Sequence, residues 1–96
     1  MSNITFSNTG RSRNFTMQFN NGYELSITKG GNAYSNPDSA EIAVLRDGEF
    51  VRIKGQDDDV IGWVSADVIA GVVYWVARGD IYGVRDAIDG YSRSRF

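Results

Sequence analysis

The sequence predicts an α+β fold: a four- to five-stranded antiparallel sheet with one helix, at about 65–78, packed on one face. Three observations support this prediction. Apolar and polar residues alternate through most of the first half, as half-buried strands require. Glycine-containing turn sequences, Asn20-Asn21-Gly22 and Asp47-Gly48, separate the alternating stretches. Apolar residues then recur at helical spacing after Ser65.

The first half is expected to contain three strands, around 4–6, 15–19 and 23–27. A two-residue Asn-Gly turn between the second and third strands would put their apolar rows on opposite faces of the sheet. A three-residue loop with Gly22 in the left-handed conformation pairs Met17 with Leu25 and Phe15 with Ile27, and keeps both rows on one face. We therefore predict the three-residue loop, and we expect Phe15, Met17, Leu25 and Ile27 to form part of the core beneath the helix.

A second hairpin is expected from strands 40–46 and 49–53. The Asp47-Gly48 dipeptide between them is typical of a type I′ turn, in which both central residues take positive φ. The register set by this turn places Val44 opposite Val51 on the face that is apolar.

The helix at 65–78 is indicated by its ends. Ser65 is a favourable N-cap, Asp67 lies in the first turn where the helix dipole stabilises an anion, and Gly79 can end the helix. Its apolar stripe consists of Val68, Ile69, Val72, Val73 and Val76. The many β-branched residues and Gly71 oppose this interpretation, so a buried strand is the alternative.

A short second helix is expected over 80–89, with Asp80 as its cap and Gly90 as its end. The chain of 96 residues is long enough for one domain, which we assign to 1–90. Residues 91–96 are expected to form a flexible basic tail.

Composition excludes most familiar enzyme chemistries. The chain has no cysteine and no histidine, so it lacks thiolates, the commonest soft metal ligands and the usual general base near neutral pH. Gly30-Gly31 lacks the Lys-Ser/Thr of a phosphate-binding loop. No apolar run approaches the length of a membrane span. We therefore expect no enzyme, no cofactor, no metal and no membrane association, and a cytoplasmic location.

The acidic middle of the chain is the candidate binding site. Between 36 and 67 there are eight acidic and three basic side chains, whereas the two ends are mildly basic. The acidic run 57–59 lacks the alternating spacing of a calcium loop, which favours a solvated or partner-facing role over metal binding. The candidate partner-binding residues are Asp47, Glu49, Asp57, Asp58 and Asp59, with Tyr34 as an exposed aromatic anchor.

Arginine pairs near both ends, Arg11-Ser12-Arg13 and Arg93-Ser94-Arg95, raise the question of nucleic-acid binding. The net charge of the chain is −2, however, and neutralisation of phosphates dominates the affinity of such binding. We therefore expect no direct contact with nucleic acid.

The order of segments resembles that of a known group of proteins. The segments are a first strand at 4–8, a strand at 23–27, a Tyr34-Ser35 loop, a hairpin starting at 40–44, the step Asp58-Asp59-Val60-Ile61-Gly62-Trp63 and a helix starting Ser65-Ala66-Asp67. In residues 4–78 the chain resembles small, uncharacterised bacteriophage-encoded accessory proteins. Phage genes of this size frequently encode inhibitors of host defence, including anti-CRISPR and anti-restriction proteins.

The resemblance implies a non-enzymatic phage protein that acts in the host cytoplasm. It would bind and inhibit a host defence protein, such as a nucleic-acid-binding CRISPR effector, by opposing its acidic surface to a basic one. Two alternatives stay open. One is a sponge for a nucleotide signal, with Tyr34 and Trp63 for stacking and Arg11 and Arg13 for phosphate, in a pocket shared between protomers. The other is a minor virion or assembly protein. A homodimer is also left open.

Overall fold

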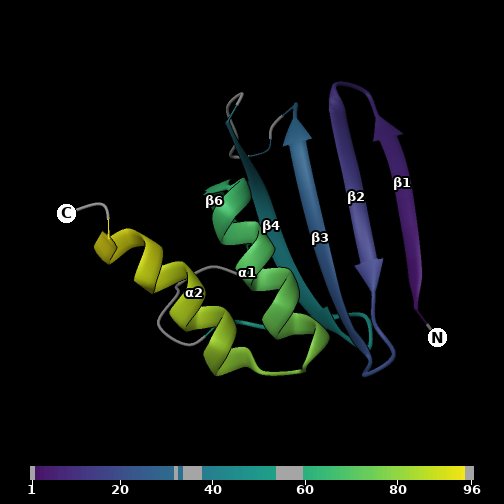
Figure 1. The fold of residues 1–96 in the computed structure, drawn as a ribbon. Coiled ribbons are helices and arrows are strands. Elements are labelled where there is room, and N and C mark those ends of the chain that lie inside the picture. Colours follow the sequence, from purple (N-terminus) through teal and green to yellow (C-terminus); the bar gives the residue numbers. More distant parts are fainter. Residues whose placement is uncertain (1, 32, 34–37, 54–59, 95–96) are drawn as a thin grey trace.

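The computed structural model describes residues 2–31, 33, 38–53 and 60–94. In this part of the chain the fold is α+β, with a six-stranded antiparallel sheet and two helices (Figure 1). The elements are β1 (Asn3–Thr9), β2 (Ser12–Gln18), β3 (Tyr23–Gly30), β4 (Ser39–Arg46), β5 (Glu49–Phe50), β6 (Val60–Ser65), α1 (Ala66–Ala77) and α2 (Ile81–Ser94). The predicted fold class is confirmed.

The strands follow one another in the order β1-β2-β3-β4. On the side away from β3, β4 pairs with two different strands, β5 and β6. β5 pairs with the end of β4 at Leu45 and Arg46, whereas β6 pairs with the beginning of β4, from Ser39 to Ala43. The sixth strand, β6, is additional to the four or five predicted. Its apolar run does not alternate, and its pairing with β4 contains a register shift between Ala40 and Ile42.

The first predicted register is confirmed. Phe15 pairs with Ile27 and Met17 pairs with Leu25, so the apolar rows of β2 and β3 share a face. The N–H of Gly22 donates to the carbonyl of Phe19 at 3.2 Å, and Gly22 has a φ of 87°. A left-handed residue at this position closes the three-residue loop, which glycine does without steric cost.

The second hairpin also has its predicted turn. Asp47 and Gly48 have φ values of 52° and 85°, as a type I′ turn requires. The N–H of Val51 donates to the carbonyl of Val44 at 2.8 Å, which confirms the predicted pair. β5 ends earlier than expected, at Phe50, yet Ile53 beyond it is still buried in the core.

α1 begins and ends where its capping residues indicate. The hydroxyl of Ser65 accepts from the N–H of Val68 at 3.4 Å, and Gly79, with a φ of 71°, follows the C-cap. Val68, Val72 and Val76 are buried on one side of the helix. The prediction of a helix is confirmed, and the alternative of a buried strand is wrong.

α2 is longer than predicted. Asp80 is its cap, because the Asp80 carboxylate accepts from the N–H of Gly83 at 2.9 Å and its carbonyl accepts from the N–H of Val84 at 3.1 Å. The helix does not end at Gly90 but continues to Ser94. A single glycine inside a helix costs only about 1 kcal/mol and does not by itself end one.

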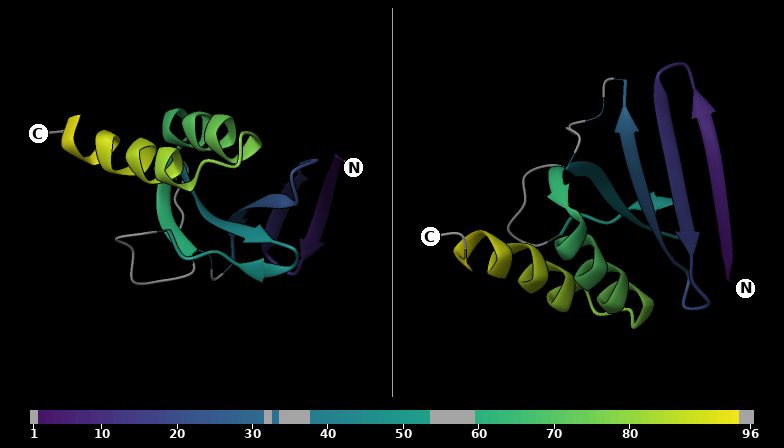
Figure 2. Two further views of the ribbon diagram at one scale, coloured as in Figure 1. Left: turned by 90° about the horizontal axis from the view of Figure 1, so that it is seen from below. Right: turned by 45° about the horizontal axis from the view of Figure 1, so that its top comes forward.

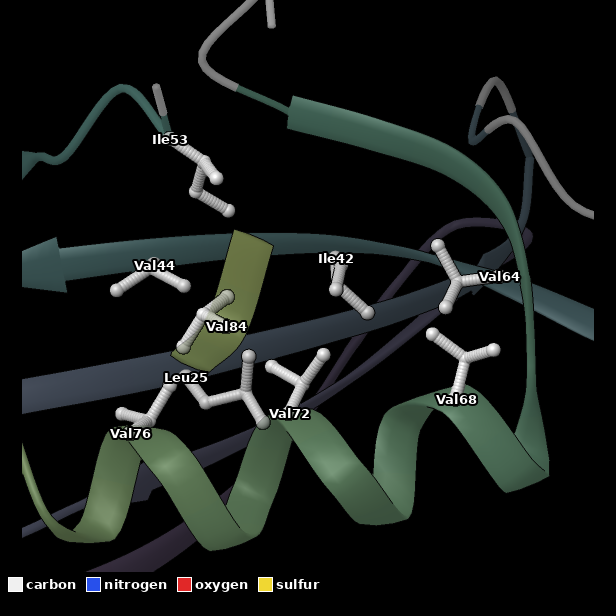
Figure 3. Close-up of a cluster of buried hydrophobic side chains, with 9 residues drawn as sticks. All are labelled: Leu25, Ile42, Val44, Ile53, Val64, Val68, Val72, Val76 and Val84. Carbon is white, nitrogen blue, oxygen red and sulfur yellow. The ribbon is translucent and has the colours of Figure 1, made fainter. Parts of the chain in front are cut away.

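The core lies between the helices and the sheet half formed by β3, β4 and β6 (Figures 1 and 2). Leu25, Ile42, Val44, Ile53 and Val64 meet Val68, Val72 and Val76 of α1 and Val84 of α2 there (Figure 3). The predicted core also included Phe15 and Met17 of β2, but these are only half-buried. In the described residues α1 contacts β3, β4 and β6, and no helix contacts β1 or β2.

Candidate functional site

The two acidic residues predicted in the second hairpin lie exposed at its tip. Asp47 is in the type I′ turn and Glu49 directly follows it, so both carboxylates face solvent at one end of the sheet. The other predicted site residues, Asp57, Asp58, Asp59 and Tyr34, lie outside the described residues.

The hairpin tip is joined to the turn between β2 and β3. The N–H of Asp47 donates to the carbonyl of Gly22 at 3.2 Å. A shallow cleft of about 310 Å³ lies between the two turns, and Glu24 and Asp47 both line it. The amide of Gln18 donates to the Glu24 carboxylate at 3.1 Å, which holds that side chain in place.

Glu24 therefore joins the predicted pair of acids, and we call Glu24, Asp47 and Glu49 the acidic tip. Sequence analysis missed Glu24 because it lies in the predicted strand 23–27, in the mildly basic first part of the chain. The pairing of β3 with β4 is what brings Glu24 to the other two acids. It places Glu24 opposite Leu45, two residues before the Asp47-Gly48 turn.

The C-terminus of α1 lies at the same end of the molecule. The side-chain amide of Asn21 donates to the carbonyls of Val76 and Ala77 at 3.0 and 3.1 Å. No basic residue lies in the last turn of α1, so the partial negative charge of the helix end is not offset from within that turn. The guanidinium of Arg46 lies 5.1 Å from the centre of the Tyr23 ring. Arg78, the C-cap of α1, has its guanidinium 3.8 Å from the centre of the Tyr74 ring, so two cations lie at this end beside the three acids. The balance at this end is negative.

Two residues of the nucleotide-sponge alternative that the structure describes, Arg13 and Trp63, do not come together within one chain. Arg13 is on β2 and Trp63 is on β6, so β3 and β4 lie between them. Trp63 has a φ of 53°, an uncommon conformation for a bulky residue, and leaves 61% of its surface exposed beside the irregular β4–β6 pairing.

An exposed apolar surface at the β1 edge of the sheet was not predicted. Ile4 and Phe6 of β1 are 60% and 77% exposed, and they pair with Met17 and Phe15 of β2. The rings of Phe6 and Phe15 meet edge to face, with their centres 4.8 Å apart. We call the face formed by Ile4, Phe6, Phe15 and Met17 the apolar wing. It lies on the face of the sheet that α1 covers farther along, as the side-by-side registers from Phe15 to Ile27 to Ile42 show.

The flank of α1 that faces the apolar wing is also apolar. Gly71 and Trp75 adjoin Ala87 and Gly83 of α2, which places α2 on one side of α1. Helical periodicity then puts Ala66, Ile69, Val73 and Ala77 on the opposite flank. Ala66 and Ile69 line a hollow together with Ile27 of β3, so this flank is next to the open part of the sheet.

The described residues contain no group of three or more acidic, histidine or cysteine side chains that could hold a metal ion. Nor does any helix in this part of the chain have the length and apolar character needed to cross a membrane.

No family model, curated protein or solved structure matches the chain.

Proposed function

We propose that this chain is a non-enzymatic binding protein whose acidic tip contacts a basic surface of another protein. The observation that supports the proposal is the convergence of three segments at one end of the molecule. The turn after β2, the β4–β5 hairpin and the C-terminus of α1 meet there. Glu24 and Asp47 line a shallow cleft between the two turns, and Glu49 is exposed beside it.

Complementary charge suits this surface to a nucleic-acid-binding partner. Proteins that bind nucleic acid carry basic patches to neutralise phosphates. An acidic surface opposite such a patch speeds association and competes with the nucleic acid. With the resemblance to phage accessory proteins, the proposal extends to an inhibitor of host defence, of which an anti-CRISPR protein is one form.

The experiment is capture of partners from a bacterial lysate by the tagged chain, after nuclease treatment, with identification by mass spectrometry. The test variant is Asp47→Asn with Glu49→Gln. Asp67→Asn with Asp86→Asn is the matched control, because it removes the same charge from exposed helical positions away from the tip. We expect a stoichiometric partner that the control retains and the tip variant loses. The partner should also dissociate at 1 M salt, where the Debye length falls to about 3 Å.

A partner that the tip variant retains would contradict the assignment of the surface. If no protein is captured and a nucleotide raises the melting temperature instead, the sponge alternative replaces this proposal, because a ligand stabilises the native state that binds it.

A further inference from the structure

Three features of the surface lie outside the acidic tip, although Ile69 and Val73 of one of them also pack against the core. They are the apolar wing, the apolar flank of α1 beside it and the free edge of β1. Each of them is a surface that proteins usually cover. They lie next to one another, so a single partner can cover all three.

The apolar wing exposes more contiguous apolar surface than a soluble monomer usually does. Phe6 alone leaves 77% of its surface exposed, on the order of 150 Å² for an aromatic side chain. Phe15 and Met17 beside it are half-buried and continue the apolar face toward the core. Contiguous apolar surface of this kind marks an interaction site rather than isolated exposed residues.

The flank of α1 gives a second, independent indication. Asp67 is the one charged residue in α1, so this helix is apolar on nearly all sides. Helices of this kind are covered all round. The sheet covers one side of α1 and α2 covers another, while exposed Ala66 and Ala77 remain on the flank that faces the apolar wing. Their small side chains allow a neighbouring element to approach closely.

The edge of β1 is unprotected. β1 has no charged residue, no proline and no break in its register with β2, although these are the devices by which edge strands avoid pairing. The N–H of Ile4 donates to the side chain of its neighbour Asn3 at 2.9 Å. By contrast, β5 at the far edge of the sheet has two residues and β6 has an irregular register.

We infer that a second copy of this chain covers these features, in a two-fold dimer in which the two apolar wings pack face to face. The two-fold axis runs along the strands, between β1 and β2. The sheets then lie about 10 Å apart, as in a β-sandwich. In an arrangement with the axis across the strands, α1 of one copy would collide with the sheet of the other.

The register of β1 with β2 fixes which residues meet. β1 of one copy lies over β2 of the other, so Phe6 lies over Phe15 of the second copy and Ile4 lies over Met17. At the end of the wing Asn8 lies over Arg13, which places an amide oxygen opposite a guanidinium rather than two like charges together. Apolar residues therefore meet apolar residues across the interface, and no two like charges are placed together.

The same arrangement places the flank of α1 beside the edge of β1 of the second copy. A helix about 10 Å in diameter covers two strands that are 4.8 Å apart. The space over β1 and β2, next to α1, is therefore wide enough for the two corresponding strands of the second copy. The wing and the flank together measure about 23 by 20 Å. This footprint is about 460 Å², and the accessible area of a corrugated face exceeds its footprint, so each copy contributes more than half of the roughly 800 Å² of a standard interface.

Sedimentation velocity over a concentration series from about 1 to 100 µM tests the dimer, because this range spans the affinities expected of an interface of this size. We expect the mass to rise from the 10.6 kDa of the single chain to twice that value. Phe6→Ser removes the central aromatic contact twice in each dimer, and should raise the dissociation constant about a hundredfold. Phe50→Ser is the matched control: Phe50 is 55% exposed but lies on the opposite face of the sheet, and the dimer should persist.

Ala77→Arg is a second test variant, because Ala77 is exposed in the single chain and lies in the contact of the dimer. Its dimer should also dissociate, while the circular dichroism melting curve at low concentration stays that of the parent. A chain that is monomeric throughout the series overturns the inference. So does a dimer that survives both Phe6→Ser and Ala77→Arg. If a different protein rather than a second copy occupies the wing, the chain is monomeric alone and Phe6→Ser removes that protein.

Discussion

Gly83 of α2 offers the sharpest test of how the two helices pack. A side chain at this position would point at Trp75 of α1: an added Cβ would lie 2.6 Å from Cε3 and 2.7 Å from Cγ of the indole ring. Real Cβ atoms do not approach ring carbons this closely, so either the ring or the helix must move. Gly71, in the middle of α1, provides the contrast, because a Cβ there would meet Cβ of Ala87 at 3.4 Å.

Two opposing effects set the magnitude of Gly83→Ala. Alanine is favoured over glycine by about 1 kcal/mol inside a helix. Overpacking a filled contact costs about 1–3 kcal/mol, and a clash with a ring that also packs against the core belongs to the upper part of that range. We expect a net loss of about 1–2 kcal/mol in the free energy of unfolding. For a domain of this size that loss lowers the melting temperature by roughly 5–15 °C.

The assay is thermal and urea unfolding followed by circular dichroism, for Gly83→Ala, Gly71→Ala and the parent. Gly71→Ala should be neutral or raise the melting temperature, because it gains helix propensity without a clash. In a Trp75→Leu background Gly83→Ala should lose its destabilising effect, which a double-mutant cycle measures as a coupling between the two positions. If Gly83→Ala stabilises the parent as Gly71→Ala does, the close approach of α2 to Trp75 is wrong.

Two further substitutions test other contacts. Val72→Asp should unfold the domain, because Val72 is 0% exposed and the variant would bury an unpaired carboxylate; a melting curve like that of the parent would show that the helix face is misassigned. Asn21→Ala should lower the free energy of unfolding by about 1–3 kcal/mol, because it removes the two hydrogen bonds to the end of α1 and the one from the N–H of Tyr23 at 3.0 Å. Urea unfolding measures the change, and Asn20→Ala, one residue earlier in the same turn, is the control.

Local signals in the sequence predicted much of the fold. The position of Gly22 and the alternation around it decide the first register, and Asp47-Gly48 decides the second. Ser65 and Gly79 mark the ends of α1 because capping depends on a few neighbouring atoms. β6 could not be predicted in this way: its pairing with β4 joins distant segments, and Trp63 interrupts it with a positive φ.

The candidate site was predictable to a similar extent. Asp47 and Glu49 were expected at an exposed turn and lie there. Glu24 joins them only through the pairing of β3 with β4, which no single segment encodes. Sequence analysis placed Phe15 in the core because its face is apolar. The extent of the helix layer, which covers β3 and β4 but not β2, decides otherwise.

The contact of Asn21 with the end of α1 has a consequence for how the chain folds. The sequence Asn20-Asn21-Gly22 is compatible with two hairpin registers, and only the three-residue loop holds Asn21 where its amide reaches the carbonyl of Val76, 55 residues along the chain. A hairpin formed early in the other register would turn one apolar row away and make Asn21 the first of two turn residues instead of the middle one of three. Docking of α1 stabilises the three-residue register and not the other. A hairpin that first forms in the wrong register is therefore expected to rearrange when α1 docks.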